Sequence, residues 1–120
     1  MPCFELSTNV PREKVTSDFI LSLSKEIAAC LGKPEQYVAV RILPDQLMSF
    51  GGTLEPCGTG QLLSIGKLGV EENKVISAKI FAEVEKTLGI PNDRMYITFV
   101  DAASSNIGYK GTTFHQIFKR

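Results

Sequence analysis

The sequence predicts an α+β fold in which a strand–helix–strand unit is repeated twice, giving a four-stranded mixed sheet with two helices on one face. An internal repeat is the first observation behind this prediction: LGKPEQYVAVRIL at 31–43 returns as LGIPNDRMYITFV at 88–100, an offset of 57 residues. The second is that the same offset, carried backwards, aligns apolar residues spaced four apart, as on the buried side of an amphipathic helix. The third is that CFELS at 3–7 then aligns with GQLLS at 60–64, a strand before each helix.

The helices are expected near residues 13–31 and 70–88. The aligned apolar pairs are Phe19 with Ile76, Leu23 with Ile80, Ile27 with Val84, and Leu31 with Leu88. Each helix runs into Leu-Gly-x-Pro, where glycine supplies a left-handed residue after the last turn and proline prevents continuation. Both helices are therefore expected to end at the same point of the repeat.

The strands after the helices are apolar on both sides. One side carries Val38, Val40 and Ile42 in the first repeat and Met95, Ile97 and Phe99 in the second. The other side carries Ala39, Arg41 and Leu43, and Tyr96, Thr98 and Val100, which is too apolar for a face left in water. Because two helices cover only one side of such a sheet, the second side is expected to meet another subunit.

Two segments lie outside the repeat. Residues 44–56, PDQLMSFGGTLEP, predict a short strand at Leu47–Phe50 followed by a Gly-Gly turn. Residues 106–118, NIGYKGTTFHQIF, predict short strands interrupted by glycines. The apolar anchors of this tail are Tyr109, Phe114, Ile117 and Phe118.

Length and composition limit the class of protein. A chain of 120 residues fits one domain, 1–120, and 13 basic against 13 acidic residues give no charge excess that favours nucleic acid. No apolar run approaches the roughly 18 residues of a spanning helix, and the N-terminus lacks a signal-peptide layout, so we expect a cytoplasmic chain with no membrane insertion. Cys3, Cys30 and Cys57 form no CxxC or Cys/His cluster, so reduced thiols are expected rather than disulfides or zinc.

The residues that could carry chemistry are few. Pro2 starts a strand, where proline is tolerated because it need not donate to the sheet; once Met1 is removed it would also be a secondary amine and a candidate general base. Lys33 stands where the second repeat has Ile90; it either complements the end of a helix or belongs to a site. GQLLSIGK at 60–67 lacks the spacing of a phosphate loop, and His115 is the single histidine available to a catalytic triad.

Short motifs in order along the chain resemble the macrophage migration inhibitory factor family of the tautomerase superfamily. They are Met-Pro at the start, TNVPR at 8–12, LGKP at 31–34, YVAV at 37–40, PDQLMSFGG at 44–52, EPC at 55–57, SIGK at 64–67, DRMYI at 93–97 and GTTF at 111–114. The resemblance runs through almost the whole chain to Phe114, and residues 115–120 extend beyond it.

The resemblance implies a homotrimer that tautomerises phenylpyruvate and isomerises dopachrome without a metal or cofactor. It makes Pro2 the catalytic base acting on carbon atoms next to the carbonyl, and it makes Lys33 and the backbone N–H of Ile65 anchors for the substrate carboxylate. Tyr96 of an adjacent subunit would line the pocket. The further walls would be Tyr37, Ile107, Tyr109 and Phe114.

Three positions depart from the family pattern. Thr98 replaces a substrate-contacting asparagine, Tyr109 replaces a tryptophan, and Gly60 replaces the second cysteine of a CxxC pair that begins at Cys57. The resemblance also implies a second role, a cytokine-like ligand exported without a signal peptide to a cell-surface receptor, with Arg12 and Asp45 as the family's charged pair. In the alternative in which signalling is the main role, the pocket is vestigial. Residues 115–120 would cap the surface of the trimer or partly cover the pocket mouth.

Overall fold

The computed structural model describes residues 1–118, and its centre is a four-stranded sheet in the order β2-β1-β3-β4. The strands are β1 (Pro2–Thr8), β2 (Ala39–Leu43), β3 (Gly58–Ser64) and β4 (Met95–Asp101). β1 runs parallel to β2 and antiparallel to β3, and β3 runs parallel to β4. The predicted mixed sheet and α+β class are confirmed.

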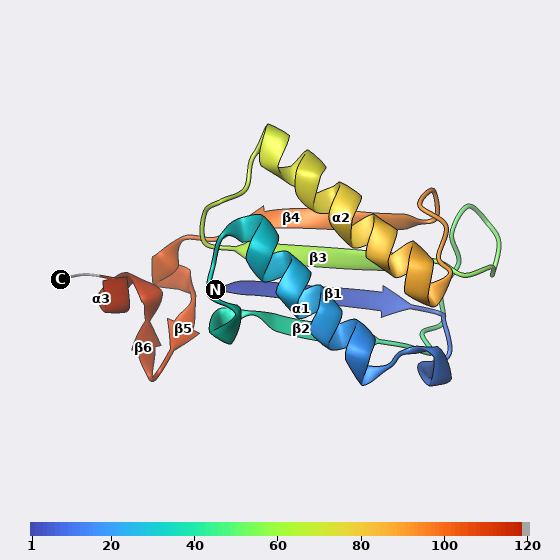
Figure 1. Cartoon of the computed structure of the whole chain (residues 1–120), viewed down its shortest axis with the longest axis horizontal. Coiled ribbons are helices and arrows are strands. Elements are labelled where there is room, and N and C mark those ends of the chain that lie inside the picture. The colour runs from blue at the N-terminus through green and yellow to red at the C-terminus, as the bar shows by residue number, and fades with distance from the viewer. Residues whose placement is uncertain (119–120) are drawn as a thin grey trace.

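The twofold repeat is visible in the chain path, as β1-α1-β2 followed by β3-α2-β4 (Figure 1). Helices α1 (Ser17–Leu31) and α2 (Val70–Leu88) lie side by side on one face of the sheet (Figure 1). Each ends at a left-handed glycine, Gly32 at φ 61° and Gly89 at φ 72°. The predicted stop signal is therefore confirmed in both copies.

The core lies between the helices and the sheet. All eight helix residues paired by the repeat are buried, and they pack against the inward side chains of β1 and β3, which include Phe4, Leu6 and Leu62. From the later strands, Met95 is buried, and Val38, Val40, Ile42, Ile97 and Phe99 are partly buried against the same core. The predicted inner face is confirmed.

The first helix begins later than the expected residue 13. Residues Arg12–Lys14 form a separate 3-10 turn, and the helix starts after Thr16. The extended Thr16 caps the helix, because its hydroxyl accepts a hydrogen bond of 3.1 Å from the backbone N–H of Phe19.

The predicted strand at Leu47–Phe50 is absent from the chain that the structure describes. The backbone N–H groups of Asp45 and Gln46 donate to the carbonyls of Val10 and Thr8, and the side chain of Leu47 is fully exposed. What remains is a single bridge between Phe50 and Thr53 across the glycine turn. The prediction was wrong for the single chain because no neighbouring strand lies beside this segment.

The second face of the sheet has no helix over it (Figure 1). Tyr96 and Thr98 are exposed on it, and Leu43 and Val100 are partly buried. β1 and β3 add polar groups to the same face, including Glu5, whose carboxylate lies 3.5 Å from Arg41. This face is more mixed in polarity than β2 and β4 alone predict.

The tail folds beyond the end of β4, near the N-terminus of the chain (Figure 1). It forms the predicted short strands β5 (Gly108–Tyr109) and β6 (Thr112–Thr113), and then an unpredicted short helix, α3 (Phe114–Phe118). Of the expected extension 115–120, residues 119 and 120 lie outside the described residues.

Candidate active site

A cavity of about 310 Å³ opens where β1 begins, and it gathers parts of the chain that are far apart in sequence. β3 ends here, because its last residue, Ser64, pairs with Pro2 at this edge of the sheet. The turn after α1 and the C-terminal tail also contribute lining residues. The lining residues are Met1, Lys33, Pro34, Tyr37, Ile65, Gly66, Lys67, Phe114 and Phe118.

Lys33 is held at the cavity by the way α1 ends. The N–H of Gly32 donates to the carbonyl of Ala29, and the N–H of Lys33 donates to the carbonyl of Ala28 at 3.0 Å. This pair of backbone hydrogen bonds, with glycine in the left-handed region, is the Schellman motif. It satisfies carbonyls of the last turn and turns the chain at Lys33.

The Lys33 ammonium joins α1 to the end of β3. Its Nζ donates to the hydroxyl of Ser64 at 3.1 Å and to the carbonyl oxygen of Ile65 at 2.7 Å. The buried Ser64 hydroxyl in turn donates to the carbonyl of Gly66. The pKa of Lys33 is lowered by burial and then by the positive charge of Lys67, and Asp101 acts in the opposite direction.

Met1 lines the cavity, and the ring of Pro2 behind it is fully buried. The pKa of the Met1 amino group is lowered, first by burial and second by the positive charge of Lys33. Both causes disfavour the protonated amine at this position. While Met1 is attached, the nitrogen of Pro2 is a tertiary amide and has no basic lone pair.

An aromatic cluster forms the wall of the site on the side of the tail. The rings of Tyr109 and Phe114 stack at 5.0 Å, and Tyr37 meets both of them edge-on at 5.7 and 6.0 Å. Tyr37 and Phe114 line the cavity itself, whereas Tyr109 packs against Phe114 and is not among the lining residues. Ile107 also lies outside the lining set, and its carbonyl accepts a hydrogen bond from the N–H of Phe114.

Two predicted site residues lie elsewhere in the single chain. Tyr96 pairs in register with Thr59 on β3, five positions from Ser64, which is about 17 Å along the strand. Tyr96 is 67% exposed, and its ring lies 4.9 Å from that of Phe50. Thr98 lies on the helix-free face, where it lines a polar hollow with Glu5 and Gln61. One chain therefore does not bring either residue to Pro2.

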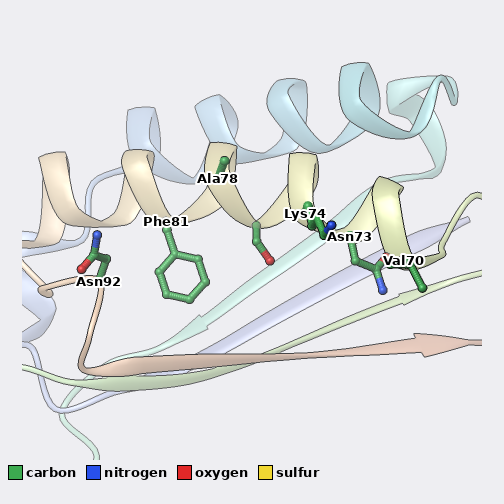
Figure 2. A pocket seen from close by; sticks show the side chains of 7 residues that line it. Val70, Asn73, Lys74, Ala78, Phe81 and Asn92 are labelled. Carbon is green, nitrogen blue, oxygen red and sulfur yellow. The ribbon is translucent and has the colours of Figure 1, made fainter.

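A second groove runs along α2 and is larger, about 560 Å³. Val70, Asn73, Lys74, Ala78, Phe81 and Asn92 are among its lining residues (Figure 2). Its single basic side chain, Lys74, is 3.2 Å from the carboxylate of Glu71 on the same helix. The groove contains no acid or base other than this paired lysine, so the cavity at Met1 is the better candidate for chemistry.

Cysteine and histidine take no part in the cavity. Burial raises the pKa of the thiols of Cys3 and Cys30, and Cys57 is fully buried; all three are free thiols. His115 is exposed on α3. Residues 1–118 contain no group of three or more His, Cys, Asp or Glu side chains placed to hold a metal ion.

Comparison with known proteins identifies the family. The family model for macrophage migration inhibitory factor (MIF) matches residues 1–115. The chain belongs to the MIF family. It is 55% identical to the MIF homolog of Trichuris trichiura over 114 residues, 95% of this chain and 100% of that protein, and 43% identical to the MIF of Rattus norvegicus over 95% of this chain and 99% of the relative.

Solved structures of MIF proteins have the same fold. The MIF of Trichinella spiralis superposes with a TM-score of 0.90 at 44% identity, covering 92% of this chain and 98% of that one. A MIF homologue from Prochlorococcus marinus gives a TM-score of 0.87 at 33% identity, covering 93% and 98%. The membership inferred from the motifs is thus confirmed.

Some residues of the cavity at Met1 were not among the predicted site residues. Pro34, Gly66 and Lys67 lie within LGKP and SIGK, so these motifs located them without giving them a role. Phe118 was predicted only as an apolar anchor of the tail. Its spacing of four from Phe114 was a helical signal that could have placed both on one face.

Proposed function

We propose that the chain is a cofactor-independent keto–enol tautomerase that acts on an aromatic keto acid such as phenylpyruvate and isomerises dopachrome, with Pro2 as the catalytic base. The observation that carries this proposal is the cavity at the start of β1, where the amino terminus, the Lys33 ammonium and an aromatic wall meet. Membership of the MIF family, which is part of the tautomerase superfamily, supports it.

The base requires removal of Met1. The nitrogen of Pro2 then becomes a secondary amine at the same end of β1, near the two influences that lower the pKa of the Met1 amine, burial and Lys33. A lowered pKa leaves a larger fraction of the amine unprotonated near neutral pH, as a general base requires.

The substrate carboxylate is bound by Lys33. An ammonium has three N–H donors, and two of those of Lys33 are used by Ser64 and Ile65, so one remains for the substrate. Lys67 adds a second positive charge to the lining. The backbone N–H of Ile65 is the proposed second donor to the carboxylate, and holding the acid in this way keeps the reacting carbon beside the amine.

The proton balance is simple. The Pro2 amine takes a proton from the carbon next to the carbonyl while the carbonyl oxygen gains a proton from water, which gives the enol. The Pro2 ammonium then returns its proton to the hydroxide that remains, and the reverse steps give the ketone. No electron leaves the substrate, so no redox partner is needed. The aryl group lies against Tyr37 and Phe114, whose support comes from Tyr109 and Ile107.

The proposed assembly is a homotrimer. Its support is the helix-free sheet face, with Tyr96 exposed on it, together with the solved MIF structures that share the fold. In this assembly the Tyr96 of an adjacent subunit completes the pocket, and Thr98 takes the position of the family asparagine. A threonine hydroxyl can donate one hydrogen bond and lacks the reach of an amide.

The test compares phenylpyruvate tautomerisation by the wild-type chain and by Pro2→Gly, after intact mass has shown that Met1 is absent from both. We expect kcat/KM to fall by about 100-fold or more, the range for loss of a general base. Pro91→Gly, in the turn after α2 and outside the cavity lining, is the control and keeps full activity. Equal activity of the wild-type chain and Pro2→Gly would reject Pro2 as the base.

A second proposed role is that of a cytokine-like ligand, exported by a non-classical route from the cytoplasm to a cell-surface receptor. Arg12 and Asp45 support it, because both are exposed and the N–H of Asp45 bonds to the carbonyl of Val10, close to Arg12 in the chain. None of the helices in residues 1–118 has the length and apolar character needed to cross a bilayer. If signalling were the main role, Pro2→Gly would leave the cellular response unchanged while Arg12→Ala with Asp45→Ala abolished it.

A further inference from the structure

We propose that Phe118 is a specificity-determining residue that forms the outer wall of the cavity and selects ligands with an aromatic ring. The inference rests on the proposed function, since it assumes that the cavity binds a carboxylate at Lys33. It concerns a residue outside the part of the chain that the family model matches, because that match ends at residue 115. The Trichuris trichiura relative is likewise aligned over its whole length in 114 residues.

The short helix α3 determines where Phe118 lies. Phe114 and Phe118 are four positions apart, so they lie on the same side of the helix. Phe114 is 3% exposed and anchors this side, whereas Phe118 is 59% exposed, and the two ring centroids are 5.4 Å apart. Since both line the cavity, the exposed ring of Phe118 borders the space in which a ligand would lie.

The lining is polar at one part and aromatic at another. Lys33 and Lys67 supply positive charge, and Phe114, Phe118 and Tyr37 supply rings. A ligand with a carboxylate and a planar ring matches both parts, because it pairs its charge with Lys33 and removes apolar surface of Phe118 from water. A carboxylate without a ring makes the first contact and forgoes the second.

The consequence is a selective effect of removing the ring. Aromatic contacts typically contribute enough that losing one weakens binding by about 3- to 10-fold. Phe118→Ala is therefore expected to weaken the binding of aryl carboxylates by about that factor and to change the affinity for small aliphatic carboxylates by less than about 2-fold. For phenylpyruvate, KM rises while kcat stays within about 2-fold, because Phe118 supplies neither the base nor a hydrogen bond to the carboxylate.

The experiment measures binding of cinnamate and crotonate, two unreactive unsaturated acids that differ in carrying a phenyl or a methyl group, by titration calorimetry. Wild type, Phe118→Ala, Phe118→Leu and Gln116→Ala are compared, the last being an exposed change on the same helix. We expect Phe118→Ala to lose affinity for cinnamate alone. The affinity of Phe118→Leu for cinnamate should lie between those of Phe118→Ala and wild type, and that of Gln116→Ala should match wild type.

Several results would overturn the proposal: an equal loss for both acids, no loss for cinnamate, or no binding of cinnamate by the wild-type chain. A loss in Gln116→Ala as large as that in Phe118→Ala would also reject it, because the helix and not the ring would then be responsible. Binding needs no turnover, so the outcome is separate from that of the proposed function. If cinnamate binds as expected and phenylpyruvate is not turned over, the proposed role of Phe118 is supported and the proposed tautomerase activity is rejected.

Discussion

The ammonium group of Lys33 donates a hydrogen bond of 2.7 Å to the carbonyl oxygen of Ile65. With its second bond to the Ser64 hydroxyl, this contact fixes the cation at the end of β3, the strand that pairs with the start of β1. The lysine therefore does more than complement the end of α1, which was the alternative that the sequence left open. It provides a positive charge at a defined place beside the amino terminus.

Replacing Lys33 by methionine is expected to weaken binding of an acidic substrate. The change removes the proposed charge-assisted hydrogen bond to the carboxylate, and such bonds contribute about 1.5–3 kcal/mol. KM for phenylpyruvate should rise by about 10- to 100-fold. Steady-state kinetics measure this, and Lys86→Met, an exposed lysine in the last turn of α2, is the matched control. An unchanged KM in Lys33→Met would show that the carboxylate binds elsewhere.

The same variant is expected to shift the pH dependence of the reaction. The positive charge of Lys33 is the second cause that lowers the pKa of the Met1 amine, after burial, and we expect it to act in the same direction on the Pro2 amine. Without it the pKa of the amine rises. Because the base acts unprotonated, activity increases as the pH passes upward through this pKa, so the acidic limb of kcat/KM against pH should move to higher pH in Lys33→Met. A limb that stays in place or moves to lower pH would contradict the electrostatic coupling.

Gly32 and Gly89 form a natural matched pair, because they end the two helices at equivalent positions of the repeat. Both have positive φ, and a Cβ added at either meets nothing within 4 Å. The cost of alanine is therefore that of the left-handed backbone alone, about 1–2 kcal/mol of unfolding free energy in each case. Chemical denaturation measures both, and an effect on KM is expected for Gly32→Ala only, since Lys33 follows it. A much larger loss at one site would mean that packing is involved.

Arg94 is expected to stabilise the loop that precedes β3. Its guanidinium donates to the carbonyls of Phe50, Glu55 and Pro56 at 2.9–3.0 Å and lies 5.6 Å from the centre of the Phe50 ring. Arg94→Ala should lower the free energy of unfolding by about 1–3 kcal/mol, because three carbonyls lose a charged donor.

Arg94→Lys should recover part of this loss, since an ammonium lacks the planar fork that serves several carbonyls. Arg41→Ala removes one exposed contact with Glu5 and is expected to change the free energy of unfolding by less than about 0.5 kcal/mol. Urea denaturation of the three variants compares them. Equal stability of Arg94→Ala and Arg41→Ala would show that these loop contacts contribute little.

The repeat made the fold predictable from one sequence. Phe19 and Ile76 occupy equivalent buried positions, and Gly32 and Gly89 end equivalent helices, so each half supported the interpretation of the other. The segments without a repeated partner were harder. Leu47 has strand-like neighbours in sequence but no strand beside it in the chain, and pairing between distant segments cannot be inferred from local pattern.

The candidate site was predictable only in part. Lys33 was singled out because it breaks the symmetry of the repeat, and its bonds to Ser64 and Ile65 depend on where β3 ends. The helical turn from Phe114 to Phe118 was not predicted, although the spacing of these residues is compatible with it, and only the folded tail brings that turn against the start of β1. In the proposed trimer Tyr96 reaches the pocket from a neighbouring subunit, which the pattern of one chain does not specify.

The central claim is that the amine of Pro2, freed from Met1, is unprotonated near neutral pH. Its most direct test is an NMR titration of the Pro2 nitrogen in the chain whose intact mass shows that Met1 is gone. Burial and Lys33 lower the pKa of the Met1 amine, and we expect the same two causes to hold the pKa of the Pro2 amine below the ordinary range of an amino terminus. An amine that is still half protonated or more at about pH 8, as an ordinary amino terminus is, would contradict the account.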